Sequence, residues 1–540
     1  MKKRIILSAL ALTVFVTTVS FKSDFFEIAK QIEIFTTMFK ELNMNYVDEV
    51  TPATLMDKAI KGMLEDLDPY TVYWNEQEVE DARIKNSGTY TGIGASVRTL
   101  KDKIVVVEPY KGYPADEAGL KAGDEIIRIG NTDLSDFDDD AGELLKGATG
   151  TTVELTYLRQ GKRETTRLTR KKVPEKAVPF YKLLDDNIGY IVLTKFNRTT
   201  TRETKAALEE LKADGATKII LDLRGNPGGL LNEAISVVNL FVPKGEVITT
   251  TKSVIEKYNR TYTTRNEPVD TEIPLVVLIN GRSASASEIV SGGLQDLDRA
   301  VVVGARSFGK GLVQRPKKLT YGTQLKVTIS RYYTPSGRCI QALDYWNRDE
   351  NGDPIRLDPK EYNAFKTKGG RTVYDGGGIL PDIEVATAEF SPITTALLKD
   401  NAIFDYATKY YYKNSLNDPS AFSFTEEDFQ DFLRFLKQND FAYETQTEKE
   451  FTEALRRSED DDLKKEIEAS YKQLMSSIEK AKTKALEDKK AEIMSLLSDE
   501  ILKRYFYRDG LYNYQVKNNP EILEAIAVLN DTNRYARILK

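Results

Sequence analysis

The chain of 540 residues contains no histidine and a single cysteine, Cys339. The absence of histidine excludes every site in which an imidazole acts as a base or binds a metal, including Ser-His-Asp triads and histidine zinc sites. A lone cysteine forms no intramolecular disulfide, and a cysteine nucleophile is not expected without a histidine beside it. A hydrolase with this composition must therefore use lysine or a carboxylate as its base.

The chain also lacks an excess of positive charge. It has 77 Lys and Arg residues against 83 Asp and Glu residues, which gives a net charge of −6, so no overall basic field is available to hold nucleic acid. Hydrophobic residues make up 41% and charged residues 30% of the chain, which is typical of a folded soluble protein. At roughly 100–200 residues per domain, the length predicts three or four domains.

The first twenty residues have the pattern of a secretory signal. A basic start, Lys2-Lys3-Arg4, precedes an apolar run over residues 5–19, and the small residue Ser20 follows. The run is short for a membrane-spanning helix. Two interpretations stay open, a signal peptide that is cleaved after Ser20 and a retained membrane anchor. Both predict export to the periplasm, with the protein either soluble there or anchored in the inner membrane.

Hydrophobic spacing divides the rest of the chain into four regions. Helical periodicity predicts helical domains over residues 21–86 and 389–540, and short strands between glycines predict a compact α+β module over residues 87–172. Over residues 173–388, apolar strands alternate with helices, which predicts a largely parallel sheet covered on both faces. Its expected strands lie at 188–194, 218–223, 274–280, 300–304 and 324–331.

The polar stretch 344–370 is expected to leave this sheet domain as an insertion. In the C-terminal region, Thr425 and Ser458 are each followed by an acidic residue three positions on, which predicts capped helix starts. After Ser458, apolar residues fall on one helical face, which packs either on the chain's own core or on a second subunit. These apolar residues are Leu463, Ile467, Tyr471, Leu474 and Ile478.

One segment at the end of a predicted strand is suited to a nucleophile. Three serines, Ser283, Ser285 and Ser287, lie among small residues between Asn280 and the helix predicted over 286–297. A hydroxyl at the N-terminus of a helix lies near unpaired backbone N–H groups and the positive end of the helix dipole, which favour an oxyanion. By local physics alone all three serines are candidates. Taken alone, the segment is more typical of a serine-rich N-cap than of a nucleophile site.

Two glycine-rich turns supply the other parts of a catalytic set without histidine. Lys310 lies between two glycines, which let the backbone approach closely, and a phosphate loop is excluded because no Ser or Thr follows the lysine. Residues 221–230 form a Gly-rich turn from a strand into a helix, with backbone N–H donors at the same sheet edge. This turn lacks the G-x-G-x-x-G spacing of a dinucleotide site.

These segments closely resemble the carboxy-terminal processing peptidases, also called tail-specific proteases. The resemblance runs from about Phe35 to Val385 and implies a serine endopeptidase with a PDZ domain inserted before a crotonase/ClpP-like α/β core. It rests on several long motifs in the family's order. These motifs are Leu67–Thr71, Gly92–Gly94, Asp222–Gly229, Gly281–Glu288, Phe308–Gly311 with Gln314, and Tyr333–Arg338.

The resemblance also implies roles for single residues. To act as a base, Lys310 must be neutral, so its pKa must fall by about three units from about 10.4, which requires burial. We therefore expect Lys310 to be buried against apolar neighbours such as Phe308 and Val313. The implied residues are the nucleophile Ser285, the base Lys310, Gln314 to orient it, and the oxyanion-hole donors Ala286 and either Gly228 or Gly229.

A further loop resembles the peptide-binding part of a PDZ domain. Its residues Gly92, Ile93, Gly94 and Ala95 match the loop whose N–H groups capture a peptide's terminal carboxylate, while the adjoining strand adds the peptide to its sheet. Residues 114–124 resemble the second half of this groove. The resemblance thus implies protein or peptide substrates with free, apolar C-termini that are cleaved near the tail.

The predicted fold is therefore multidomain, α+β and α/β. No metal or other cofactor and no nucleic acid partner is expected, and three roles stay open for the C-terminal helices: to cap the chain's own core, to bind a second copy, or to bind an adaptor protein. Two other functions stay open, a PDZ-based scaffold with an inactive core and a crotonase-like enzyme that binds an acyl-CoA. The predicted domains are a signal or anchor (1–20), a helical domain (21–86), a PDZ domain (87–172), a peptidase core with an insertion (173–388) and a helical domain (389–540).

Overall fold

A computed structural model describes residues 25–540 except 138–139, 351, 386–389, 420–421 and 461–463. The expected signal or anchor at residues 1–20 lies outside the described residues. The chain divides into two compact units: one holds the residues up to Asn75 together with Pro316–Thr328, and the other holds Glu76–Arg315 and Ile329–Lys540. Among the described residues, none of the helices combines the length and the hydropathy needed to cross a membrane.

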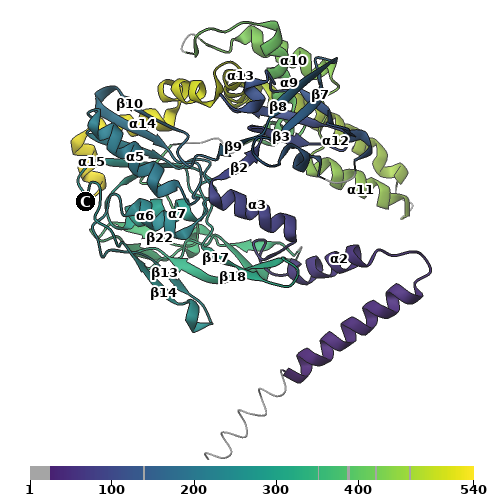
Figure 1. Cartoon of the computed structure of the whole chain (residues 1–540), viewed down its shortest axis with the longest axis horizontal. Helices are drawn as coiled ribbons and strands as arrows, with labels where there is room; N and C mark the ends of the chain where they lie inside the picture. Colours follow the sequence, from purple (N-terminus) through teal and green to yellow (C-terminus); the bar gives the residue numbers. More distant parts are fainter. Residues whose placement is uncertain (1–24, 138–139, 351, 386–389, 420–421, 461–463) are drawn as a thin grey trace, which may run out of the picture. The chain divides into compact units, whose positions relative to one another are not determined.

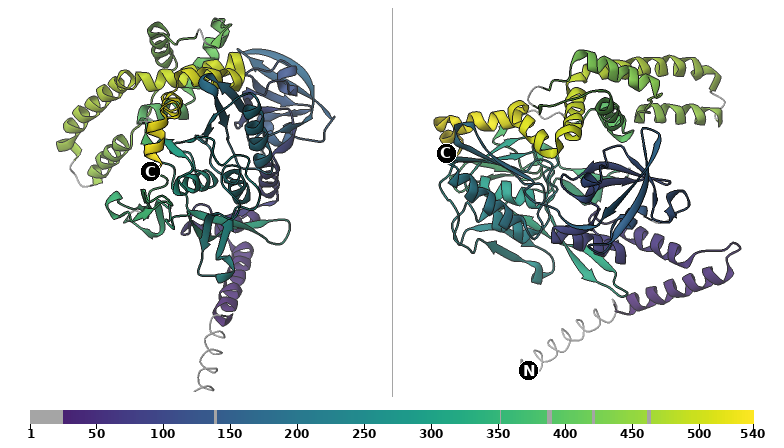
Figure 2. Two further views of the ribbon diagram at one scale, coloured as in Figure 1. Left: turned by 90° about the vertical axis from the view of Figure 1, so that its left-hand side faces the viewer. Right: turned by 45° about the horizontal axis from the view of Figure 1, so that its top comes forward.

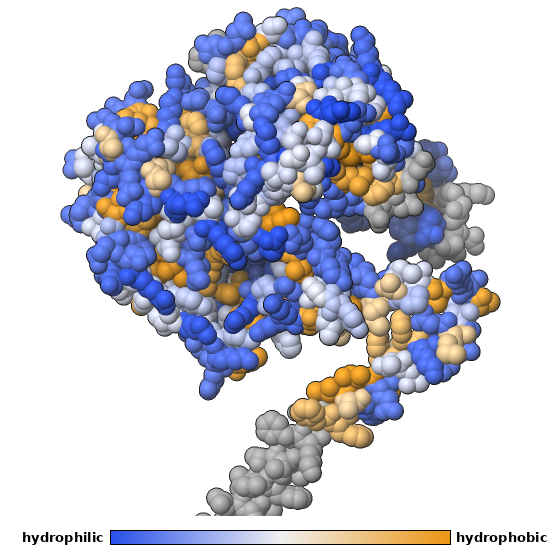
Figure 3. Space-filling model, in the orientation of Figure 1, coloured by the Kyte–Doolittle hydropathy of each residue, from blue (hydrophilic) through white to orange (hydrophobic). Residues whose placement is uncertain are grey.

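The first unit is mainly helical. A helix over residues 25–45 precedes α2 (Pro52–Glu65), and a turn held by the Asp68 carboxylate leads into β1 (Val72–Trp74). β1 pairs antiparallel with the first residues of β18 (Gln324–Tyr333). The helix over residues 25–45 exposes large apolar side chains along its length, which Figure 3 shows in orange.

The second unit begins with the predicted PDZ module. Its sheet has the order β3-β4-β5-β7-β8 with β6 beside β5, and all of these pairs are antiparallel. A separate ladder joins β2 to β9. The elements are α3 (Glu76–Ser87), β2 (Thr89–Gly92), β3 (Ala95–Thr99), β4 (Ile104–Pro109), α4 (Pro114–Glu117), β5 (Glu125–Ile129), β6 (Thr132–Asp133), β7 (Thr152–Arg159), β8 (Lys162–Thr169) and β9 (Lys171–Pro174).

Two segments of this module differ from what their sequence suggests. The glycine-bounded run 92–97 suggests one strand, but a turn at Ile93 and Gly94 separates β2 from β3, and Gly94 has a φ of +73°. The run 138–145 suggests a short helix, but Ala141–Leu145 forms a 3₁₀ turn, and residues 138–139 lie outside the described residues.

The peptidase core is built on a six-stranded sheet of order β10-β11-β12-β15-β16-β23. All neighbours are parallel except β10 and β11, which confirms the predicted, largely parallel sheet. The four inner strands, β11, β12, β15 and β16, are buried over nearly their whole length because they present Val, Ile and Leu side chains to both covered faces, whereas the edge strands β10 and β23 are partly exposed. The bounds are β10 (Phe180–Leu184), β11 (Ile188–Val192), β12 (Lys218–Asp222), β15 (Leu275–Ile279), β16 (Val301–Gly304) and β23 (Ile383–Glu384).

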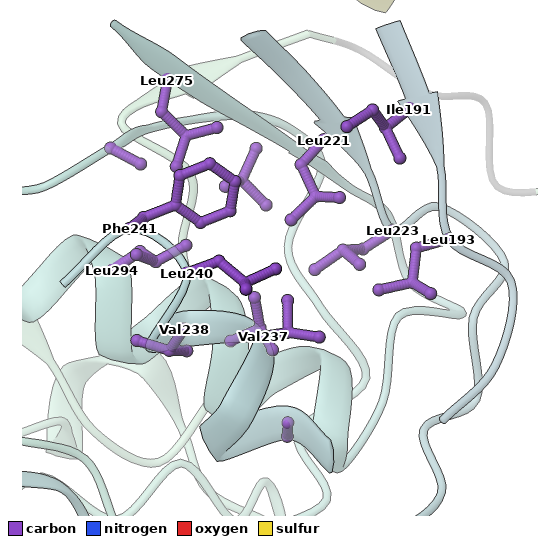
Figure 4. Close-up of a cluster of buried hydrophobic side chains, with 14 of the residues drawn as sticks. Ile191, Leu193, Leu221, Leu223, Val237, Val238, Leu240, Phe241, Leu275 and Leu294 are labelled. Carbon is purple, nitrogen blue, oxygen red and sulfur yellow. The ribbon is translucent and has the colours of Figure 1, made fainter. Parts of the chain in front are cut away.

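Helices cover the two faces of this sheet. α5 (Thr200–Ala213), α6 (Leu231–Val238) and α7 (Ala286–Asp296) pack on one face, where side chains such as Leu221 and Leu275 meet Val237, Val238 and Leu294 (Figures 1 and 4). α14 (Pro520–Asn530) and α15 (Thr532–Ile538) cover the other face. The C-terminal helices therefore complete the core of the peptidase sheet.

The strand predicted at 324–331 belongs to a different sheet. The second half of β18 pairs antiparallel with β13 (Val247–Lys252), which pairs with β14 (Arg260–Thr263). Most β18 side chains are only half-buried, unlike those of the continuous apolar strands in the parallel sheet. The expectation that this strand joins the parallel sheet is therefore wrong.

The stretch 344–370 leaves the parallel sheet, as expected. It forms one hairpin, β19 (Leu343–Arg348) with β20 (Pro354–Arg356), and then enters another, β21 (Ala364–Lys366) with β22 (Thr372–Tyr374). These two hairpins account for most of the added length between β18 and the edge strand β23.

The C-terminal region is helical, as predicted. Thr425 and Asp428 form a capping box at the start of α10, which confirms that start, but Ser458 lies in the last turn of α11, so a helix start there is wrong. α11 and α12 run side by side (Figure 2). The elements are α8 (Pro392–Lys399), α9 (Ala402–Lys413), α10 (Glu426–Gln438), α11 (Gln446–Asp460), α12 (Lys464–Asp488) and α13 (Lys490–Asn518).

The apolar stripe predicted after Ser458 begins at Leu463, which lies outside the described residues. Further along, the Tyr471 hydroxyl meets the Thr452 hydroxyl of α11 at 3.0 Å, while Ile467 stays 37% exposed. At Tyr471 the stripe therefore faces the chain's own helix.

Candidate active site

Ser285 occupies an elbow between a buried strand and a helix. β15 ends at Ile279, α7 begins at Ala286, and Ser285 caps α7 with φ +55° and ψ −110°. A residue other than glycine rarely adopts a positive φ, so the surrounding contacts must hold this conformation. Ser285 is partly exposed at the carboxyl edge of the parallel sheet, where ligands of such sheets bind.

The other two candidate serines are structural. The Ser283 hydroxyl donates to the Leu223 carbonyl at 2.8 Å, and the Ser287 hydroxyl donates to the Asn226 carbonyl at 2.9 Å. Both side chains are fully buried. Burial and these two bonds therefore single out Ser285 from the three serines.

Glu288 is a fully buried carboxylate between the elbow and the loop of the predicted base. Its Oε2 atom accepts from the backbone N–H groups of Ser285 at 2.7 Å and Lys310 at 2.9 Å. Its Oε1 atom accepts from the Gly309 N–H at 2.7 Å and the Ser307 hydroxyl at 2.5 Å. Burial raises the pKa of Glu288, and the four donors oppose that rise by stabilising the carboxylate.

Lys310 lies in the loop between β16 and β17 (Leu312–Lys318). Gly309 has a φ of +87°, and a Cβ there would lie 2.4 Å from a neighbouring side chain, so only glycine fits before the lysine. Lys310 and Val313 are partly buried, but Phe308 is 43% exposed. Lys310 is thus only partly buried, where burial was expected, and one of its expected apolar neighbours, Phe308, is itself largely open to solvent.

Gly228 and Gly229 differ in what their N–H groups do. The Gly228 N–H donates to the Asn226 side-chain oxygen at 2.9 Å, whereas the Gly229 N–H has no partner among the described residues, and neither does the N–H of Ala286. A Cβ on Gly228 would lie 2.9 Å from the Cβ of Ser285. Two N–H groups at the elbow, those of Gly229 and Ala286, are therefore available to donate hydrogen bonds to an oxygen anion.

Asn226 fastens this turn to the elbow, a role that the sequence did not indicate. Its side-chain amide donates to the Leu193 carbonyl at 2.8 Å, and its own carbonyl accepts from the Ala284 N–H at 3.0 Å. The residue is fully buried. The end of β11 and the elbow are thus both held by one residue, through its side chain and its backbone carbonyl.

Arg224 links the same turn to the C-terminal helices. It binds the Asp222 carboxylate at 2.6 Å, the Asn519 side chain at 2.7 Å and the Glu521 carboxylate at 3.0 Å. Burial lowers the pKa of Arg224, but the two carboxylates outweigh this effect and raise it. The Tyr190 hydroxyl donates to Asp222 at 2.6 Å and completes a buried network.

The helix that leads to Asn519 also contacts the PDZ module. α13 is interrupted at Tyr507, which has a φ of +56°. At this break the Tyr507 hydroxyl donates to the Asp116 carboxylate at 2.5 Å, and Arg508 binds the Glu108 carboxylate at 2.9 and 2.7 Å. One helical segment, residues 507–521, therefore contacts both the PDZ module and Arg224 of the oxyanion turn.

The predicted peptide loop, Gly92, Ile93, Gly94 and Ala95, has aromatic side chains beside it, with Tyr113 next to Gly94. The Ile93 side chain is buried in the module's core, and the ring of Tyr90 packs against Gly92. Burial raises the pKa of Tyr90, while the N–H groups of Gly94 and Ala95, which face its hydroxyl oxygen, lower it. The N–H donors of the loop thus lie against a phenol oxygen.

Within the described part of the chain, no group of three or more cysteine and carboxylate side chains is placed to hold a metal ion.

Comparison with known proteins assigns these parts to one family. The model of peptidase family S41 matches residues 187–345, which carry both the elbow and the loop of Lys310. A carboxy-terminal-processing protease of Bartonella bacilliformis is 37% identical over 321 residues, which cover 58% of this chain and 73% of that protein. The chain belongs to peptidase family S41. It is thus a serine-type peptidase related to the carboxy-terminal processing proteases.

Other parts of this S41 peptidase match further family models. A PDZ domain matches residues 91–169, a C-terminal helical domain of probable PDZ-proteases matches 393–529, and the N-terminal domain of the activating protease CtpB matches 17–78. These matches confirm the predicted fold class, a PDZ domain and an α/β peptidase core between helical domains.

Two further relatives of the S41 peptidase are named here. The carboxy-terminal processing protease CtpA of Bacillus subtilis is 34% identical over 307 residues, or 56% of this chain and 65% of that protein. Among solved structures, a photosystem II D1 C-terminal processing protease is 28% identical, with a TM-score of 0.35, over 60% of this chain and 91% of that one.

Proposed function

We propose that this S41 peptidase is an exported endopeptidase that cleaves proteins near apolar C-termini with a Ser285/Lys310 dyad. The observation that carries the proposal is the shared Glu288 oxygen, which binds the backbone N–H groups of both Ser285 and Lys310. A carboxylate that bonds to both residues fixes the spacing between nucleophile and base. The absence of histidine leaves lysine as the residue suited to this role.

In this proposal, neutral Lys310 takes the proton from the Ser285 hydroxyl as the oxygen attacks the substrate carbonyl carbon. The carbonyl oxygen becomes an anion that accepts from the N–H groups of Ala286 and Gly229, because the Gly228 N–H is engaged by Asn226. Lys310 then gives its proton to the leaving amine as the C–N bond breaks. Water, deprotonated by Lys310, releases the acyl group from Ser285.

Gln314 is the residue that we propose to orient Lys310. It lies four residues on, in β17, and lines the same side of the site as Val313. The side-chain amide of a glutamine can accept a hydrogen bond from a lysine amine, which fixes where the lone pair of the amine points.

The PDZ domain would select the substrate by its end. The loop over residues 92–95 would bind the free carboxylate through its N–H groups, and β3 would add the peptide as a strand. The Tyr90 hydroxyl faces these same N–H groups, so a bound carboxylate would take its place. Export rests on the basic and apolar start of the sequence, residues 2–20.

The test uses a protein substrate with an apolar C-terminus and mass spectrometry of the products. The wild-type chain should release C-terminal fragments, while Ser285→Ala and Lys310→Met should each lower kcat/KM by at least about a thousandfold without loss of folding. Gln314→Ala should lower kcat by about tenfold or more. Full activity of Lys310→Met would contradict the proposed role of Lys310 as the base, and cleavage by Ser285→Ala would contradict the proposed role of Ser285 as the nucleophile.

A further inference from the structure

An open cleft of about 590 Å³ lies beside the proposed active site. One wall comes from Leu230, directly after the Gly229 that offers an oxyanion donor. The opposite wall comes from Val313, Gln314 and Arg315, the part of β17 that follows the loop of Lys310. A substrate chain held at the elbow would therefore place a neighbouring side chain in this cleft.

Apolar side chains form part of the inner surface of the cleft, beside polar ones such as Thr251 and Ser330. Leu230, Leu231, Val313 and Ile329 are all partly buried and contribute aliphatic side chains, and the buried Tyr258 contributes an aromatic ring. Such a surface favours the methylene groups of an incoming side chain, at roughly 25 cal/mol per Å² of apolar surface removed from water.

The rim carries an excess of positive charge. Arg198, Arg260 and Arg315 are exposed, and none of their guanidinium groups has a hydrogen bond or ion pair within the described residues. The one acidic residue of the lining, Glu233, already accepts from the N–H and hydroxyl of Thr201. Three unpaired cations above an apolar floor match a side chain that has a short apolar stem and a negative end.

We propose that this cleft is a specificity subsite for an acidic side chain, glutamate or aspartate, of the substrate segment that flanks the cleaved bond. The proposal rests on the proposed function, because it deepens the substrate choice of the same peptidase. The aliphatic stem of the glutamate lies on Leu230 and Val313, and its carboxylate meets the guanidinium groups of Arg260 and Arg315. In this proposal the PDZ domain binds the C-terminus of the substrate, and the cleft binds a side chain next to the cleaved bond.

The test uses quenched fluorescent peptides that share one sequence and one apolar C-terminus. A single Glu is moved through four positions on each side of the mapped cut, and each peptide has a Gln partner of equal shape. In the wild type, kcat/KM for Glu should exceed that for Gln by about five- to twentyfold at one position, and 300 mM NaCl should reduce this ratio. The double variant R260Q/R315Q should bring the ratio below about twofold.

An arginine outside the cleft, Arg356 on β20, provides the matched control, and R356Q should keep the wild-type ratio. Binding is measured separately, as the Kd of C-terminally amidated Glu and Gln peptides for S285A, because the amide removes the carboxylate that the PDZ loop would bind. A Glu preference in Kd that R260Q/R315Q abolishes supports the subsite even if no peptide is cleaved, in which case only the proposed function fails.

Three results would overturn the subsite. The first is an equal rate for Glu and Gln at every position of a cleaved peptide, together with equal Kd values. The second is a Glu preference that R260Q/R315Q leaves unchanged. The third is a preference that follows the free terminal carboxylate of the peptide and is indifferent to Glu, which would assign the three arginines to the chain end.

Discussion

Two carboxylates, the fully buried Glu288 at the elbow and the half-buried Asp499 on α13, differ in how many hydrogen bonds they accept. Glu288 accepts from four donors, three backbone N–H groups and one hydroxyl. Asp499 accepts one hydrogen bond, from the Gln515 side chain at 3.2 Å, and burial raises its pKa to about 6 despite the nearby Lys503 charge. Burial pushes the pKa of both groups upward, and the number of donors decides how far each rise is opposed.

This difference distinguishes Glu288, whose carboxylate holds parts of the site together, from Asp499, whose carboxylate has few compensating hydrogen bonds. The donors of Glu288 come from the elbow and from the loop of Lys310, so its charge is used to join two loops. The donor of Asp499 lies sixteen residues on, beyond the break of α13 at Tyr507, so within the described network of hydrogen bonds the Asp499 carboxylate joins only the two halves of one helix. The negative charge of Glu288 should therefore be needed for activity, whereas the negative charge of Asp499 should lower the stability of the folded chain.

The largest effect is expected when Glu288 loses an acceptor. In Glu288→Gln one oxygen becomes an NH₂ group, which cannot accept from either of the two donors that now face it, and each buried unpaired donor costs about 1–3 kcal/mol. We expect kcat/KM to fall by at least about a hundredfold, with kcat lowered more than KM is raised. Peptide cleavage assays check this.

Glu288→Asp keeps the charge and shortens the side chain, so it serves as the partner variant. It should recover part of the lost kcat if the carboxylate positions the two loops. If the activity of Glu288→Gln stays within threefold of the wild type, the charge of Glu288 is not needed for activity, and Glu288 does not differ from Asp499 in this respect.

A smaller effect, on stability, is expected at Asp499. Its pKa of about 6 in the folded chain lies above the usual value of 3.8, so the folded state holds a proton that the unfolded state loses between pH 4 and 6. Stability should therefore fall by about 3 kcal/mol as the pH rises through this window, and stay low above it. Asp499→Asn removes this dependence and should unfold at a higher temperature at pH 8.

Thermal unfolding of both chains at pH 4.5 and pH 8 checks the Asp499 prediction. At pH 4.5, where Asp499 is largely protonated, the two midpoints should lie close together, and peptidase activity should be similar in both chains at either pH. An Asp499→Asn chain that unfolds at a lower temperature at pH 8 would show that the ionised carboxylate is stabilising, like that of Glu288.

The smallest effect is expected at the single donor of Asp499. Gln515→Leu deletes the hydrogen bond to the carboxylate, so the pKa of Asp499 should rise above 6 and the chain should lose about 1 kcal/mol of stability at pH 8. The same substitution in the Asp499→Asn background should cost less, because a neutral amide needs the donor less. Equal losses of stability in the two backgrounds would show that the effect of Gln515 does not depend on the charge of Asp499.

Local features of the site could be predicted from the sequence, and long-range ones could not. A strand end, small residues and a helix start follow one another at Ser285, and a glycine on each side of Lys310 marks a close approach of the backbone. The bonds of Glu288 join residues up to 22 positions apart, and no spacing rule encodes them. The only signal is a charged residue in the first turn of a helix whose next six residues, up to Leu294, are small or apolar.

The fold shows the same division. Strand 218–223 was predicted in the right sheet because a continuous apolar run must be buried on both faces. Strand 324–331 was placed in the wrong sheet, because its alternating pattern shows that it is a strand but does not show which strand it pairs with. The choice between Gly228 and Gly229 needed one contact, that of Asn226 with the Gly228 N–H.

The left-handed backbone of Ser285, with φ of +55°, also limits which amino acid could serve as nucleophile. Threonine carries a hydroxyl too, but its branched Cβ makes a positive φ especially costly, and such strained conformations cost about 1–3 kcal/mol. Cysteine has an unbranched Cβ and could occupy the same backbone without this penalty. The backbone conformation of the elbow thus limits which residues this position accepts: of the two amino acids with an aliphatic hydroxyl, only serine fits.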